Sequence, residues 1–258
     1  TISDKAMLIG WVIWRFIIAL FDRVVVKLGV NLYTTVKPII FIIDTNHAMT
    51  TVTKPIDTDN KPILTIDKLD VQRGDFVLCQ EVQLTLEMGD VCHLIGENGL
   101  GKTTLMSQIA GLLPIIHGTC VCAGAMVYVS HQLGISAALT VAQNLRFLLS
   151  LYGVDADDTL IDEALWQVGL EGLQDISSVQ LSAGQMRRVG LARLFVLTPN
   201  EASFWLLDEP LTALDTTMVQ RLEACILAFA KAGGAVLMTS HQATKATNRQ
   251  LNLAEFAL

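Results

Sequence analysis

Apolar and polar residues alternate over residues 76–88 and again over residues 91–95. A period of two predicts two half-buried strands. A glycine-rich segment follows at residues 96–101, and beyond it apolar residues recur at four-residue spacing: Leu105, Ile109 and Leu113. That spacing predicts one buried face of a helix, which Pro114 should end. The sequence therefore predicts a strand, loop and helix unit in a domain that begins near Ile63.

The pattern turns helical between about residues 135 and 197. Thr140 and Gln143 have the spacing of a capping box, in which each side chain bonds the backbone N–H of the other residue at a helix start. Apolar residues at a second helical spacing follow: Leu160, Ala164 and Val168. We expect this segment to be a helical insert.

Short apolar runs on either side of the insert have the length of buried strands. They lie at residues 126–130, 204–207 and 235–239, and the last two bracket a helical pattern around residues 219–229. Strands that alternate with helices indicate a parallel sheet covered by helices. The fold class predicted is α/β, interrupted by the helical insert.

Residues 1–60 differ in composition from the rest of the chain. Their first part is rich in Ile, Val, Trp and Phe, but Arg15 interrupts the longest apolar run. A membrane span needs about 20 mostly apolar residues. We interpret residues 1–48 as an upstream extension before Met49, with a membrane-associated segment as the alternative, and residues 61–258 as one domain.

The charge balance bears on the class of ligand. The 258 residues include 18 basic and 25 acidic side chains, for a net charge of -7. Proteins that bind nucleic acid neutralise phosphates with basic side chains, so this balance disfavours a nucleic-acid partner. Five cysteines are scattered, and the one close pair, Cys120 and Cys122, lacks the spacing of zinc or redox motifs. We expect reduced thiols, with this pair on one face of a strand within residues 119–129.

Residues 96–103 match the phosphate-binding loop pattern G-x-x-x-x-G-K-[ST] between a predicted strand and a predicted helix, the context that the motif requires. The glycines let backbone N–H groups turn toward phosphates, and Lys102 brings a positive charge to the β and γ phosphates. The Thr103 hydroxyl is expected to ligate Mg²⁺. The residues expected to bind nucleotide here are Gly96, Glu97, Asn98, Gly99, Leu100, Gly101, Lys102, Thr103 and Thr104.

A second motif combines a buried strand with two acids. The apolar residues 204–207 lead directly into Asp208 and Glu209. We expect Asp208 to hold Mg²⁺ and Glu209 to polarise the attacking water as a general base. The loop and the acids together predict a nucleotide hydrolase, although a kinase, a GTPase or a DNA-repair ATPase could share them.

A third motif separates these classes. Residues 181–185, Leu-Ser-Ala-Gly-Gln, precede a predicted helix at residues 186–197. A serine hydroxyl and a glycine N–H at a helix start form an anion site, here Ser182 and Gly184, with Gln185 beside them. This segment resembles the signature motif of the ABC ATPase family, and a small-molecule kinase would leave it unexplained. The resemblance covers about residues 63–251 and implies a P-loop NTPase core with an antiparallel β edge.

The resemblance implies roles for three more residues, at the Q-loop, the D-loop and the switch histidine: Gln132, Asp215 and His241. Gln132 would contact Mg²⁺ and the γ phosphate, and His241 would act in hydrolysis as the partner of Glu209. The family normally stacks an aromatic residue on adenine. This chain has Arg73 at that place and Phe76 nearby, and both remain candidates.

Within the family, several segments resemble the haem exporter ATP-binding subunits of cytochrome c maturation: residues 131–135, 139–147, 182–194 and 239–242. The resemblance implies ATP and Mg²⁺ as cofactors, and two partners: a CcmB-like membrane permease and a second copy of the chain in an ATP-sandwich dimer. It also implies a peripheral place on the cytoplasmic face of the inner membrane. The alternatives are the ATPase of another small ABC exporter or a soluble ABC ATPase without a transport role.

Overall fold

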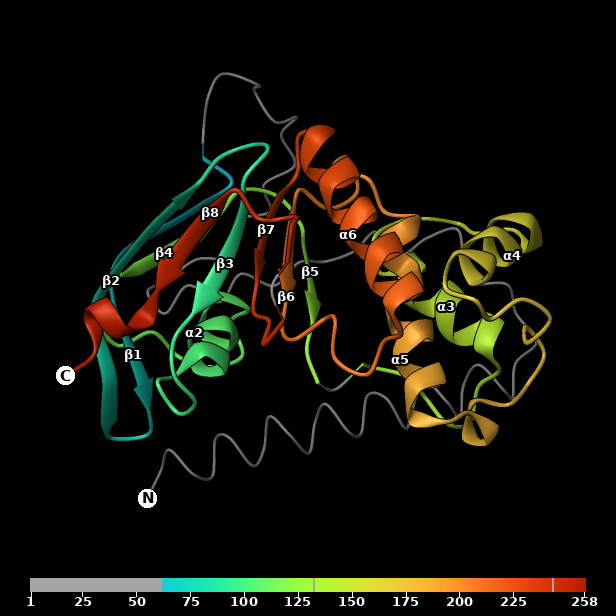
Figure 1. Cartoon of the computed structure of the whole chain (residues 1–258), viewed down its shortest axis with the longest axis horizontal. Helices are drawn as coiled ribbons and strands as arrows, with labels where there is room; N and C mark the ends of the chain where they lie inside the picture. Colours follow the sequence, from blue (N-terminus) through green and yellow to red (C-terminus); the bar gives the residue numbers. More distant parts are fainter. Residues whose placement is uncertain (1–61, 132, 243) are drawn as a thin grey trace, which may run out of the picture. The chain divides into compact units, whose positions relative to one another are not determined.

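The computed structural model describes residues 62–131, 133–242 and 244–258 (Figure 1). The predictions for residues 1–60 and for Gln132 therefore lie outside the described residues. Among the residues that are described, no helix is long and apolar enough to cross a membrane.

A five-stranded parallel sheet forms the centre of the fold, in the order β5-β6-β7-β3-β8. Its strands are β3 (Val91–Ile95), β5 (Met126–Val129), β6 (Phe204–Leu207), β7 (Ala235–Met238) and β8 (Arg249–Asn252). Every residue of β6 and β7 is buried, as expected for parallel strands that are covered on both faces.

A second sheet confirms the antiparallel β edge. It has the order β2-β1-β4, with β1 at Leu64–Arg73, β2 at Phe76–Leu86 and β4 at Thr119–Cys122. The first two strands form a hairpin in which Leu64 lies opposite Leu86 and Arg73 lies opposite Phe76.

The expectation that Cys120 and Cys122 share one face of a strand within residues 119–129 is confirmed. The segment forms β4 in one sheet and β5 in the other, because the chain turns between them at Gly124, whose φ is +91°. Cys120 and Cys122 lie two residues apart on β4 and are partly buried. Burial raises the pKa of the Cys120 thiol to about 11 and that of Cys122 to about 12. All five cysteines are free thiols.

Five α-helices complete the described fold: α2 (Lys102–Ile109), α3 (Val141–Ser150), α4 (Asp158–Gln167), α5 (Ala183–Ala192) and α6 (Thr216–Lys231). Short 3₁₀ turns lie at Ser178–Gln180, Arg193–Phe195 and Leu253–Phe256. Figure 1 shows α3, α4 and α5 gathered at the end of the fold away from the three-stranded sheet. These three helices fall within the predicted insert.

Helix ends show where sequence patterns mislead. Helix α2 stops at Ile109 rather than Leu113, because Gly111 takes a φ of +70° and the chain bends away. Helix α3 begins as predicted, with the Thr140 hydroxyl accepting from Gln143 N at 3.2 Å and the Gln143 side chain accepting from Thr140 N at 3.0 Å. Capping also moves the start of α5 to Ala183, earlier than expected.

The strand β6 divides the buried core. Phe204 and Leu206 pack with α2 and the two-sheet interface, whereas Trp205 and Leu207 pack with α5, α6 and the helical insert. Side chains alternate between the faces of a strand, so one short strand serves both cores. The Trp205 and Phe229 rings are stacked with their centroids 3.7 Å apart.

Candidate functional site

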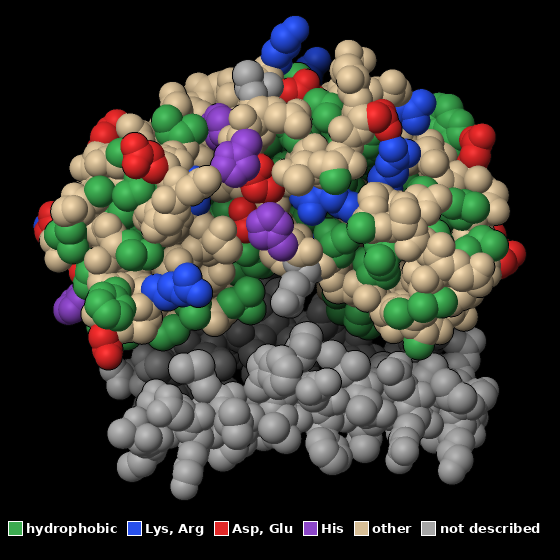
Figure 2. All heavy atoms as spheres, turned by 60° about the horizontal axis from the view of Figure 1, so that its bottom comes forward, with side chains coloured by type: hydrophobic (Ala, Val, Ile, Leu, Met, Phe, Trp, Pro, Cys, Tyr) green, Lys and Arg blue, Asp and Glu red, His purple; other side chains and the backbone are tan. Residues whose placement is uncertain are grey.

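The predicted site residues follow neighbouring strands of the parallel sheet. Residues 96–101 follow β3, Asp208 and Glu209 follow β6, and His241 follows β7. The sheet order β6-β7-β3 puts these three strand ends side by side. Open parallel sheets bind ligands outside the carboxyl ends of their strands. Figure 2 shows histidine, acidic and basic side chains gathered near the centre of one face of the molecule.

The loop between β3 and α2 needs glycine at several positions. Gly96, Gly99 and Gly101 have positive φ values of 152°, 91° and 99°. A Cβ atom at Gly101 would lie 2.9 Å from Val71 Cγ1 and 3.0 Å from Leu78 Cδ1, because the β1–β2 hairpin packs against the loop. The hairpin therefore packs against one side of the loop, and the positive φ values at the glycines let the loop backbone curve.

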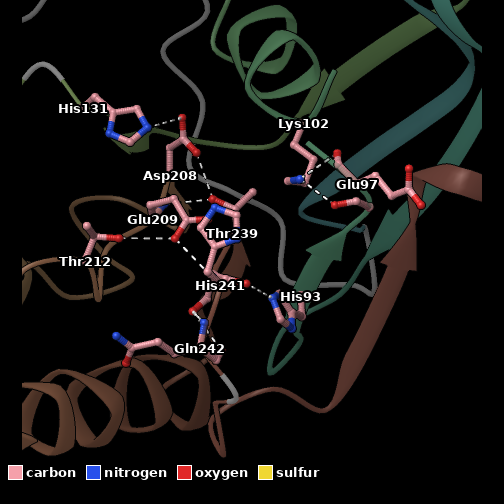
Figure 3. Close-up of polar contacts among 12 residues, drawn as sticks. His93, Glu97, Lys102, His131, Asp208, Glu209, Thr212, Thr239, His241 and Gln242 are labelled. Carbon is pink, nitrogen blue, oxygen red and sulfur yellow. Dashed lines mark hydrogen bonds and ion pairs between the residues drawn. The ribbon is translucent and has the colours of Figure 1, made fainter. Parts of the chain in front are cut away.

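Lys102 lies at the centre of this loop. Its ammonium group donates to Gly96 O at 2.6 Å and to Glu97 O at 3.1 Å (Figure 3). Helix α2 starts at the same residue, and within the described residues no side chain caps its first turn and no acid lies there. Thr103 is exposed in that turn and Thr104 is half-buried. An uncapped helix start with a lysine is a site for a phosphate group.

Asp208 has one carboxylate oxygen engaged and one open. The residue is 2% exposed, and Oδ1 accepts a hydrogen bond from the Thr239 hydroxyl at 2.8 Å. Oδ2 is buried and accepts no hydrogen bond from the described residues. His131 Nε2 lies 3.9 Å from Oδ2. A buried anionic oxygen left without a donor fits a divalent cation, so the residues present suit Mg²⁺.

Glu209 points its carboxylate toward the end of β7 instead. Oε2 accepts from His241 N at 3.2 Å and from the Thr212 hydroxyl at 3.4 Å, and Oε1 lies 3.5 Å from His241 Nε2 (Figure 3). The backbone N–H of Glu209 donates to the Thr239 hydroxyl at 2.8 Å. The two acids, adjacent in sequence, therefore have different partners and can have different roles.

Thr239 was not predicted as a site residue, although its hydroxyl contacts both acids. It donates to Asp208 and accepts from Glu209, and it is 1% exposed. Thr212 and Arg187 were missed as well. A polar residue at the end of an apolar strand was the only signal for Thr239, and the sequence offers none for the other two.

The segment at residues 181–185 caps α5. The Ser182 hydroxyl accepts from Gln185 N at 3.2 Å, and Gln185 Oε1 accepts from Ser182 N at 2.9 Å. A hollow of about 350 Å³ lies over this helix start, lined by Gly169, Leu170, Ser182, Gly184, Gln185, Arg188 and Ala213. A Cβ atom at Gly184 would meet its nearest neighbour at an ordinary 3.9 Å, so packing within the chain does not require glycine there.

Asp215 caps the next helix. Its Oδ1 accepts from Met218 N at 2.9 Å at the start of α6, and its Oδ2 forms an ion pair with Arg188. The Met218 N–H, with the Arg188 charge as a lesser cause, lowers the pKa of Asp215. Asp215 and α5, the helix that begins after Ser182, are therefore linked directly.

Not all predicted residues are brought together. Figure 3 shows Lys102, Asp208, Glu209 and His241 around one space, whereas Figure 1 shows α5 on the other side of β5 and β6 from α2. The adenine candidates, Arg73 and Phe76, face each other across the hairpin, and Phe76 is 78% exposed.

Comparisons with known proteins agree with this geometry. Residues 79–212 match the family model described as ABC transporter. The cytochrome c biogenesis ATP-binding export protein CcmA of Vibrio cholerae is 38% identical over 206 residues, covering 73% of this chain and 96% of that protein. The protein of the same name from Saccharophagus degradans is 38% identical, covering 69% and 86%. An ABC transporter ATP-binding protein structure from Pyrococcus furiosus superposes with a TM-score of 0.66 at 27% identity, covering 76% of this chain and 99% of that one.

Proposed function

Because this chain belongs to the ABC transporter family of ATP-binding proteins, we propose that it hydrolyses ATP for the haem exporter complex of cytochrome c biogenesis. It is the ATP-binding subunit of an ABC transporter. The cargo assignment is supported by relatives named as cytochrome c biogenesis export proteins that this chain covers almost completely. The ATPase of another small ABC exporter is the alternative.

The observation that supports this reaction is that Asp208 and Glu209 have different partners. The open Oδ2 of Asp208, the Thr103 hydroxyl and Gln132, which lies outside the described residues, would hold Mg²⁺. When bound, Mg²⁺ neutralises charge on the β and γ phosphates. Residues 96–101, Lys102 and Thr104 bind the phosphates through backbone N–H groups and one positive charge.

Glu209 is the general base of the proposed reaction. Its carboxylate accepts a proton from the attacking water while the water oxygen bonds to the γ phosphorus and the bond to the ADP oxygen breaks. His241 orients the carboxylate from both its backbone N–H and its ring. The exposed ring of His241 is also free to contact the γ phosphate.

A second copy of the chain completes each site. Ser182, Gly184 and Gln185 line a hollow at the start of α5, and Figure 1 shows α5 on the far side of β5 and β6 from α2, the helix that Lys102 begins. An anion in this hollow would be another chain's γ phosphate. Asp215, next to that helix through Arg188, lies at the same interface. The permease partner would be CcmB-like, and the chain would lie peripherally on the cytoplasmic face of the inner membrane as a transport-coupled ATPase. Arg73 or Phe76 would stack on adenine.

Glu209→Gln and Lys102→Ala test the assignment of the reaction. Glu209→Gln should retain ATP affinity and lose at least about 100-fold in turnover, because the amide has the same shape but does not accept the proton. Lys102→Ala should instead weaken ATP binding. Nucleotide binding and single-turnover hydrolysis measure both effects, and a Glu209→Gln chain with normal turnover would contradict the base assignment.

Mixing two inactive variants tests the composite site. Lys102→Ala lacks nucleotide binding, and Ser182→Arg blocks the hollow, but a heterodimer of the two retains one intact site. Partial ATPase activity should therefore return on mixing in the presence of the permease. No activity, under conditions where wild-type subunits exchange, would contradict the model. The permease that copurifies identifies the exporter class.

A further inference from the structure

Arg187 is a buried cation that the proposed chemistry leaves without a role. It lies on α5, five residues after Ser182, and is 8% exposed. Its Nη2 donates to the backbone carbonyl of Glu209. Burial lowers the pKa of Arg187, and the charges of Glu209 and Asp208 oppose that shift. A charged group is seldom buried without a structural or functional reason.

The residue that Arg187 contacts has an unfavourable backbone conformation. Glu209 has a φ of +52°, in the left-handed region that disfavours residues with a side chain. Pro210 further restricts the residue that precedes it. Such a conformation persists only where its surroundings hold it, and strained residues cluster at functional sites.

Three hydrogen bonds hold the Glu209 backbone. Its N–H donates to Thr239, and its carbonyl accepts from Thr212 N at 3.2 Å and from Arg187. Two of these partners, Thr212 and Thr239, lie in the segments that follow β6 and β7. Arg187 alone among the three belongs to α5, the helix that starts at the signature segment.

Helix α5 thus connects two regions of the site. Its first turn is fixed by the Ser182 and Gln185 capping box and lines the hollow proposed for another chain's γ phosphate. Its second turn holds Glu209 through Arg187 and Asp215 through Arg188. A helix is stiff over such a short distance, so its start and these contacts are positioned together.

We propose that Arg187 is a positioning residue that sets the direction of the Glu209 carboxylate and ties it to the placement of α5. This inference rests on the proposed role of Glu209. Hydrolysis of the nucleotide bound to one chain would then depend on the position of α5 in that chain. The start of the same helix would contact the nucleotide bound to the other chain. The contact between Arg187 and Glu209 would therefore couple the two nucleotide sites of a dimer through α5.

A double-mutant cycle in the full chain separates positioning from general support of the fold. Arg187→Met removes the donors but retains an apolar stem, and Glu209→Gln removes the base. ATP affinity, the single-turnover rate and urea unfolding would be measured for each variant and for the pair. Arg146→Met is the matched control, because Arg146 is an arginine of the helical insert that pairs with the exposed Asp158.

Arg187→Met should lower the single-turnover rate about tenfold or more while ATP affinity changes less than about twofold, since hydrogen bonds to charged groups have this effect. In the Glu209→Gln background the same substitution should change the residual rate less than about twofold, because its action passes through Glu209. Arg146→Met should leave both quantities unchanged.

The inference would be overturned if Arg187→Met lowered the rate by the same factor in the wild-type and Glu209→Gln backgrounds. A normal rate in a folded Arg187→Met chain would overturn it as well. If Arg187→Met does not fold, Arg187→Lys retains the charge without the planar guanidinium fork. That chain should lose at least about threefold in rate, only when Glu209 is present, and a wild-type rate would overturn the inference. A Glu209→Gln chain that turns over normally would instead refute the proposed function.

Discussion

Replacing Thr239 with valine removes one oxygen atom and leaves two buried polar groups without it. In the wild-type chain the hydroxyl donates to Asp208 Oδ1 at 2.8 Å and accepts from Glu209 N at 2.8 Å. Valine has nearly the same shape, so the substitution changes hydrogen bonding more than packing. Asp208 would then have both carboxylate oxygens buried without a donor among the described residues.

The size of the effect follows from those two contacts. A hydrogen bond to a charged group contributes about 1.5–3 kcal/mol, and a neutral one about 1 kcal/mol. The two share one hydroxyl and are not strictly additive, so we expect the free energy of unfolding to fall by about 2–4 kcal/mol. For a domain of this size the melting temperature should fall by roughly 5–15 °C.

Thr239→Ser is the matched control, because it retains the hydroxyl and removes a buried methyl group at a cost of about 1 kcal/mol. Urea unfolding of the three full-length chains, in the absence of nucleotide, measures the difference. Valine should be clearly more destabilising than serine and should also slow ATP hydrolysis. If valine were equal to serine in stability, the bridging hydroxyl would not have the role that the geometry assigns to it.

Two further predictions concern packing and thiol chemistry. Gly234→Ala should destabilise the fold by about 1–3 kcal/mol, since a Cβ atom would lie 2.1 Å from Phe229 Cε1, and Phe229→Leu in the same chain should recover part of the loss in urea unfolding. Burial raises the pKa of the Cys225 thiol to about 12, so alkylation of Cys225 at pH 8 should be slow in the folded chain and rapid in urea. A rate unchanged by unfolding would contradict this reading.

The fold was predictable where one short segment contained the whole signal. The strand at Phe204–Leu207 is a continuous apolar run with clear ends, the strand at Val91–Ile95 ends directly before the glycine-rich loop, and both were placed correctly. Strand β8 was missed because Arg249–Asn252 lies at a sheet edge and reads as polar.

The site was predictable to the same extent. Lys102, Asp208 and Glu209 belong to contiguous motifs whose spacing is set by the ligand. Thr239 and Arg187 act through hydrogen bonds to residues that are 30 or 31 and 22 positions away in sequence. Such contacts depend on the order of strands in the sheet and on where a helix starts. The local sequence pattern predicts neither of these.

The geometry also explains why two neighbouring acids need not compete for one ion. Glu209 has its carboxylate oxygens facing His241 and Thr212, which already contact both oxygens. Asp208 has a donor on one oxygen alone, so its other oxygen gains most from a cation. The left-handed backbone at Glu209 turns the second carboxylate away from the first. The strained backbone of Glu209 would therefore separate the proposed metal binding from the proposed proton transfer, and the contacts from Thr239 and Arg187 hold that backbone in place.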